Sequence, residues 1–183
     1  MAHGNEQKLG ELILYVAKKS ESDPRFGKTK LNKLLFFADF YAYGATGQAI
    51  TGVPYWRLPL GPGPQNLLAV LARLARDSDI EERVRYHQGI PQDRTVALRE
   101  PDLSLFSASE LHVVDRVIEK CRPMSAAYIS EVSHQFPGWE YAKDYEVIPY
   151  DTVYLSFRRV TGAETEGIAG IMAHLAAGRP NAA

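Results

Sequence analysis

The chain has 183 residues, and its 21 Lys and Arg nearly balance its 22 Asp and Glu, so no excess of positive charge points to a nucleic acid or an anionic membrane as a partner. A single cysteine excludes an intramolecular disulfide, and no apolar run approaches the roughly 18 residues that a membrane span needs. Because the N-terminus also lacks the basic and apolar parts of a secretion signal, we expect a cytoplasmic protein without membrane contact.

Helical spacing of apolar residues predicts the first two elements. A stripe from Leu9 to Val16 indicates one helix, and the turn-forming residues 20–27 end it. The next helix, predicted over 28–43, is apolar nearly all round, which is typical of a helix at the centre of a fold. Asp39 lies within this helix, and we expect a hydrogen bond with an Asn, Tyr or Arg to satisfy its carboxylate.

Residues 49–64 contain four prolines, so they cannot form a regular helix and could contribute at most a short edge strand. Their last part, PLGPGP, precedes a helix predicted over 65–76, as a phosphate-binding loop would. However, Pro62 and Pro64 each remove a backbone N–H donor that such a loop needs, and no Lys or Ser/Thr of the corresponding motif follows. We therefore interpret PLGPGP as a loop that positions the helix, with Pro64 at or near the first helical position.

The second half of the chain predicts a hairpin and further helices. Apolar and polar residues alternate in 80–87 and in 94–100, which indicates a β-hairpin whose longer loop is QGIPQD. In FSASEL, Ser107 and Glu110 form a capping box at the start of a helix, and short helices are expected over 125–134 and after Trp139. The sum is a mainly α (α+β) fold, a compact bundle of six or seven helices around the central apolar helix with a small antiparallel β-hairpin or sheet.

A separate capping signal marks the C-terminal end. Thr161 and Glu164 precede a stripe of apolar residues that predicts a helix over 163–177. We divide the chain into a domain at 1–160 and a C-terminal amphipathic helix with a frayed tail at 161–183. This helix is expected to dock on its own domain, and homodimerisation is the alternative.

No motif for catalysis or metal binding emerges. The five histidines have no pair at the spacing of three or four that places two ligands on one helix face. Cys121 lies on an apolar stripe, where a thiol behaves as a small hydrophobe. His134 is expected to cap its helix or to lie buried beside Trp139. We therefore expect no enzyme, no cofactor and no metal.

Aromatic residues remain as the best candidates for function. Tyr55, Trp56 and Arg57 occur together on a proline-rich segment, and aromatics with Arg are enriched at interface hot spots. The alternative is that Trp56 fills the core beneath the loop.

The segment KTKLNKLLFFADFYAY resembles the signature helix of the Panacea domain, also called the SocA-like antitoxin or phage-associated GepA-like domain. That family continues with an aromatic segment containing Trp and Gly-Pro, and then with a helix, a Ser-Ala pair, a Ser-His pair and a Trp. The matching residues are Lys30, Leu31, Lys33, Leu34, Leu35, Phe36, Phe37, Ala38, Trp56, Arg57, Gly61, Pro62, Glu110, Ser125, Ala126, Ile129, Ser130, Ser133, His134, Trp139 and Ile148.

This resemblance implies a mainly helical antitoxin of a bacterial or phage toxin–antitoxin system, with a role in phage defence. Such domains neutralise a cognate toxin by direct protein–protein interaction, and at least one member delivers its toxin to a ClpXP-type protease as an adaptor. No catalytic residue comes with the family. The expected partner-binding residues are Tyr55, Trp56, Arg57, Lys33, His134 and Trp139.

Two other functions are ranked lower. A DNA-binding transcriptional regulator would need a concentrated set of cations on one element, and the best set is only Lys28, Lys30 and Lys33. A hydrolase would use Asp39 and His134, provided that the fold brings them together in an open pocket.

Overall fold

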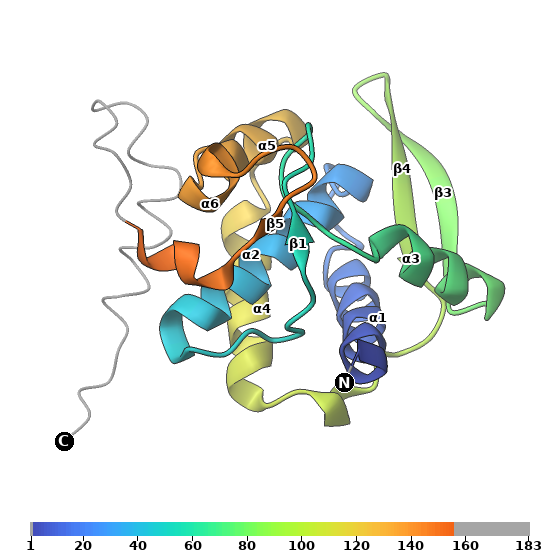
Figure 1. Cartoon of the computed structure of the whole chain (residues 1–183). Coiled ribbons are helices and arrows are strands. Elements are labelled where there is room, and N and C mark those ends of the chain that lie inside the picture. The colour runs from blue at the N-terminus through green and yellow to red at the C-terminus, as the bar shows by residue number, and fades with distance from the viewer. Residues whose placement is uncertain (1, 156–183) are drawn as a thin grey trace.

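The structure is a computed structural model and describes residues 2–155 (Figure 1). Its helices are α1 (Ala2–Lys19), α2 (Lys28–Thr46), α3 (Leu67–Arg76), α4 (Ala108–Cys121), α5 (Ala126–His134) and α6 (Pro137–Tyr141), with 3-10 turns η1 (Leu103–Leu105) and η2 (Tyr150–Tyr154). Its strands are β1 (Tyr55–Trp56), β2 (Gly63–Pro64), β3 (Ile80–His87), β4 (Ile90–Ala97) and β5 (Val147–Ile148). The predicted mainly α (α+β) fold is confirmed. Within 2–155, no helix is long and apolar enough to span a bilayer. The helix predicted at 163–177 and the division at 160 lie outside the described residues.

The predicted central helix is α2, which contacts α1, α4, α5, η2 and β2 (Figure 1). Every side chain from Leu34 to Ala42 is buried, which explains why its sequence is apolar all round. The helix continues past its predicted end at residue 43 and stops at Thr46. It ends there because Gly47 adopts the left-handed conformation, at φ 77°, and donates its N–H to the Tyr43 carbonyl.

Asp39 has a structural role in this core. It is fully buried, and its carboxylate accepts hydrogen bonds from the Thr51 backbone N–H (2.6 Å), the Thr51 hydroxyl (2.5 Å) and the Tyr55 hydroxyl (2.8 Å). Burial raises the pKa of Asp39, and these donors oppose the shift. The expected Tyr partner is confirmed, and the contacts fix the start of the proline-rich segment on α2.

The proline-rich segment contains more sheet than its sequence predicts. β1 is the central strand of an antiparallel sheet with the order β2-β1-β5, where only an edge strand was expected. Pro64 pairs with Tyr55 in the edge strand β2, a position that tolerates a missing N–H. Because α3 begins only at Leu67, the prediction that Pro64 starts this helix is wrong.

The hairpin β3–β4 is confirmed, but its predicted long loop is wrong. His87 pairs directly with Ile90, and the turn consists of Gln88 and Gly89 with φ 50° and 78°. Positive φ at both positions suits the tight turns that join twisted strands. The hairpin stands at one side of the molecule, and its turn projects beyond the helices (Figure 1).

Side-chain caps mark the starts of α4 and α5. Ser107 Oγ accepts from the Glu110 N–H (3.2 Å), and the Glu110 carboxylate accepts from the Ser107 N–H (2.7 Å), so the predicted capping box is confirmed. Ser125 caps α5 in a similar way, because its side chain accepts a hydrogen bond from a backbone N–H in the first turn of that helix. The helix expected after Trp139 begins earlier, at Pro137, and therefore contains the indole.

Two buried lysines of α2 attach distant loops to the core. Lys30 Nζ donates to the Asp23 carboxylate (2.6 Å) and to the carbonyls of Arg122 (2.9 Å) and Met124 (3.0 Å), which hold the α4–α5 connection. Lys33 Nζ donates to the carbonyl of Leu60 (2.8 Å) and more weakly to that of Pro62 (3.3 Å). Each lysine is only 1% exposed. Burial lowers the pKa of Lys33 to about 7.

These contacts explain the PLGPGP stretch. Its carbonyl oxygens point inward to an amine, whereas a phosphate-binding loop directs N–H groups outward to an anion. Gly61 has φ 101°, and a Cβ built on it would collide with Lys33 Nζ and lie 2.6 Å from Ser133 Oγ. Only glycine therefore fits between the loop and α2.

We predict that Gly61→Ala lowers the free energy of unfolding by ~3 kcal/mol or more, because the methyl group displaces a buried, hydrogen-bonded amine. Gly47→Ala is the matched control, since Gly47 has φ 77° and open space around its Cβ position. It should lose only the backbone cost of ~1–2 kcal/mol. Urea unfolding measures both values, and equal losses would show that the contact with Lys33 is unimportant.

We also predict that stability increases with pH above about 7 because of Lys33. The unfolded lysine keeps its proton up to its usual pKa of ~10.4, whereas the folded one loses it near its lowered pKa, so the unfolded state binds more protons. A neutral amine can still donate to both carbonyls. Relative to Lys33→Met, the wild type should gain about 1–1.5 kcal/mol between about pH 7 and about pH 8.5.

Urea unfolding of both proteins at several pH values tests this prediction. Burial also raises the pKa of Cys121 to about 12, which lowers stability once an unfolded thiol ionises, but both proteins contain this thiol, so its contribution cancels in the comparison. Parallel pH profiles in the two proteins would contradict a lowered pKa at Lys33.

Candidate functional site

Three of the residues predicted to bind a partner meet at one place. His134, the last residue of α5, stacks on Trp139 of α6, with ring centroids 4.1 Å apart and an angle of 11° between the planes. The guanidinium carbon of Arg57, which follows β1, lies 4.2 Å from the centre of the same indole. We call these three side chains the indole stack.

The indole stack is built on the loop 58–62. Trp139 Nε1 donates a hydrogen bond to the Leu58 carbonyl (3.0 Å), and the Gly61 N–H donates to the same carbonyl (2.9 Å). The loop is therefore held from α6 by Trp139 and from α2 by Lys33. Leu60, between these attachments, directs an apolar side chain outward that is 80% exposed.

Arg57 joins the stack to the segment between α6 and β5. Its guanidinium forms an ion pair with Asp144, and its backbone N–H and carbonyl bond to Glu146 O (2.9 Å) and Tyr145 N (2.8 Å). These bonds extend the pairing of β1 with β5. The orientation of Arg57 is thus fixed by both its backbone and its side chain.

His134 occupies the less polar side of the site. Burial lowers the pKa of His134, a hydrogen bond with the Leu60 backbone opposes this shift, and the positive charges of Lys33 and Arg57 act in the same direction as burial. Its Nε2 is buried without a hydrogen-bond partner among residues 2–155. Of the two structural roles expected for His134, the position beside Trp139 is confirmed.

The other predicted partner-binding residues lie deeper. Tyr55 is fully buried and bonds to Asp39, and Lys33 is occupied by the loop carbonyls, so both side chains support the site from the interior. Trp56 is half-buried in the central strand, neither a core residue nor fully exposed. The burial of Lys33 was not expected from the sequence, because lysines are seldom buried.

The structure also bears on the lower-ranked functions. Asp39 bonds to Thr51 and Tyr55, while His134 stacks on Trp139, so the fold gives the two proposed hydrolase residues separate environments. Of the three lysines considered for DNA binding, Lys30 and Lys33 are buried. In the part of the chain that the structure describes, no three or more His, Cys, Asp or Glu are placed to hold a metal ion.

Sequence reasoning missed Asp144 and the segment around it. This segment has no periodic pattern, and its shape depends on Tyr145, which adopts a positive φ of 62°. A non-glycine residue in that conformation has no local signal in the sequence. The Pro-Gly pair before it was a turn signal in the sequence, but these residues lie in α6.

Comparison with curated proteins and with solved structures gave no match. A family model described as antitoxin SocA-like, Panacea domain, matches residues 31–140. The matched range begins in α2 and ends in α6, so it contains Lys33 and the whole indole stack. Because this range is more than half of the 183 residues, the chain belongs to the SocA-like antitoxin family with a Panacea domain.

Proposed function

We propose that this protein neutralises a toxin by direct protein–protein binding. Membership of the SocA-like family supports an antitoxin role, and a toxin is the partner that this role implies. Neutralisation either blocks the toxin or presents it to a ClpXP-type protease. The half-life of the toxin in cells with and without that protease separates the two modes, because only delivery shortens it.

We further propose that the toxin binds at the indole stack. The observation that carries this proposal is an Arg–Trp–His stack beside an exposed leucine, on a loop held by α2 and α6. Arg and Trp are frequent anchors at interfaces, and a fixed backbone loses little entropy on binding. The half-buried Trp56 is included in this surface, with Tyr55 and Lys33 as its support.

We predict that Arg57→Ala weakens toxin binding about tenfold or more, because it removes an interface anchor and releases Trp139. The melting temperature should fall by only about 2–4 °C, since a partly exposed ion pair and one cation–π contact contribute about 1 kcal/mol. Arg83→Ala is the control, because Arg83 also forms an ion pair, with Glu81, but lies on the hairpin.

The toxin for this test is the product of a neighbouring gene that is toxic alone and harmless when co-expressed with this protein. Calorimetry gives the affinities, and differential scanning fluorimetry gives the melting temperatures. Equal affinities for wild type, Arg57→Ala and Arg83→Ala would exclude the indole stack from the interface. If no neighbouring product binds, the antitoxin proposal itself fails.

A further inference from the structure

The outer face of α5 leads directly to the indole stack. Ala127, Tyr128 and Glu131 are exposed, and their spacing places them on the same side of the helix as His134. Tyr128 is 46% exposed. Since His134 contacts Trp139, this helix face and α6 form one continuous surface.

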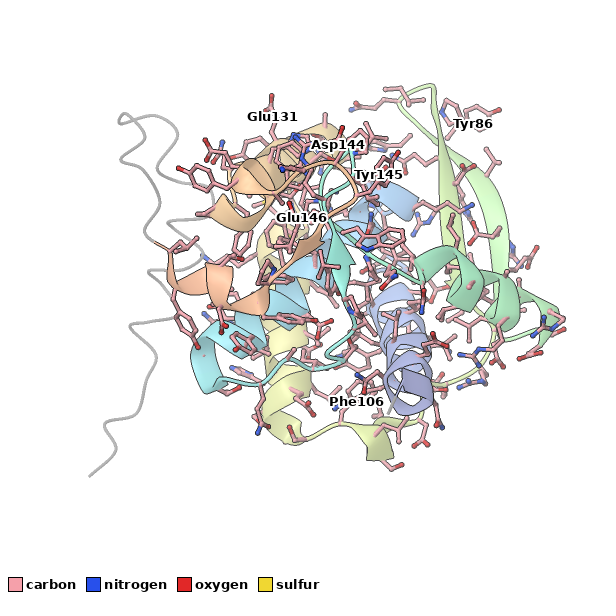
Figure 2. The ribbon with its side chains drawn as sticks, in the orientation of Figure 1. Tyr86, Phe106, Glu131, Asp144, Tyr145 and Glu146 are labelled. Atoms are coloured by element: carbon pink, nitrogen blue, oxygen red, sulfur yellow. The ribbon has the colours of Figure 1, made fainter. Side chains whose placement is uncertain are left out.

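The segment after α6 continues this surface beyond Arg57. Its large exposed hydrophobic side chains are Tyr145 (63%) and Val147 (47%), and Tyr141 (72%) at the end of α6 adds a third. Figure 2 shows Glu131 at the same end of the molecule as Asp144 and Tyr145. The backbone here is fixed, because the Tyr145 N–H donates to Arg57 O and the Lys143 N–H donates to the Glu146 carboxylate (2.8 Å). We call the surface from Tyr128 to Val147, with Arg57, the α5–α6 face.

The α5–α6 face carries an excess of negative charge. Its exposed carboxylates are Glu131, Glu140, Asp144 and Glu146, against the two cations Arg57 and Lys143. Asp144 is paired with Arg57, and Glu146 accepts the N–H described above. Between residues 2 and 155, the carboxylates of Glu131 and Glu140 form no hydrogen bond or ion pair, although the charge of Glu131 acts on His134, and both side chains are exposed.

A surface that combines exposed tyrosine rings with carboxylates that have no ion-pair partner is suited to bind arginine and lysine side chains. A guanidinium or ammonium gains from the face of an aromatic ring and from a charge-assisted hydrogen bond to a carboxylate. The same charges repel the phosphates of a nucleic acid. The charge of the face thus favours a basic protein segment over an acidic one.

We propose that the α5–α6 face binds an arginine- or lysine-bearing segment of the toxin, with Glu131 and Glu140 pairing with its cations and the exposed tyrosines covering their aliphatic stems. That the partner is a toxin rests on the proposed function. The cationic character of the bound segment rests on the charges and exposure of the face itself.

The first test compares the double variant Glu131→Gln/Glu140→Gln with the double variant Glu21→Gln/Glu119→Gln. All four side chains are exposed carboxylates without a hydrogen bond or ion pair in the described structure, but the second pair lies on the α1–α2 connection and on α4. Toxin affinity is measured by calorimetry at about 0.05 M and about 0.3 M NaCl. The first variant should bind about three- to tenfold more weakly at low salt and depend less on salt, and the second should follow the wild type.

A toxin that binds the wild type and both variants equally, with the same dependence on salt, would overturn the inference and leave the antitoxin function intact.

A second measurement requires no toxin. The wild type is titrated with an acetylated, amidated peptide of alternating Arg and Gly, and with its Glu–Gly counterpart, while the indole N–H resonance of Trp139 is followed by NMR. A shift with the Arg peptide alone, reduced in Glu131→Gln/Glu140→Gln, supports the inference; no shift, or equal shifts with both peptides, contradicts it.

Discussion

A buried amine needs hydrogen-bond acceptors, and this requirement organises the molecule. An unsatisfied ammonium in a core is very costly, so a helix that buries two lysines must be surrounded by oxygen atoms. In α2, most of these acceptors are main-chain carbonyls from segments distant in sequence, the α4–α5 connection for Lys30 and the loop 58–62 for Lys33. Moving either segment away would leave a buried donor unpaired. The central helix therefore determines where two connections lie, in addition to supplying the hydrophobic core.

The surface site follows from this arrangement. Because Lys33 holds the Leu60 carbonyl, the neighbouring Leu58 carbonyl is in place for the indole N–H of Trp139. The indole then provides one ring on which both His134 and Arg57 stack. Burial lowers the pKa of His134, while Arg57 brings to the stack a cation that pairs with Asp144 beside it.

Local patterns in the sequence were sufficient for the helices but not for the site. Apolar periodicity identified α2, and Ser107 with Glu110 identified the start of α4, because both signals come from residues within a few turns of each other. β1, in contrast, is defined by partners in 63–64 and 147–148, and no property of Tyr55 or Trp56 alone reveals them. The burial of Lys33 was missed for a similar reason, since its acceptors lie 27 and 29 residues away. Arg57, His134 and Trp139 were named as candidates from the sequence, but only the fold shows that they touch.

The loop 58–62 separates the part of the chain that fixes its position from the part that faces solvent. Lys33 and Trp139 recognise main-chain oxygens, which every amino acid possesses, and Gly61 is the one position where an added side chain has no room. The outward side chain of Leu60 takes no part in these attachments. Its chemical nature can therefore change without altering the anchoring of the loop. A scaffold built in this manner can acquire a new binding preference by exchanging a few outward side chains, while its folding remains governed by the same lysine, glycine and tryptophan.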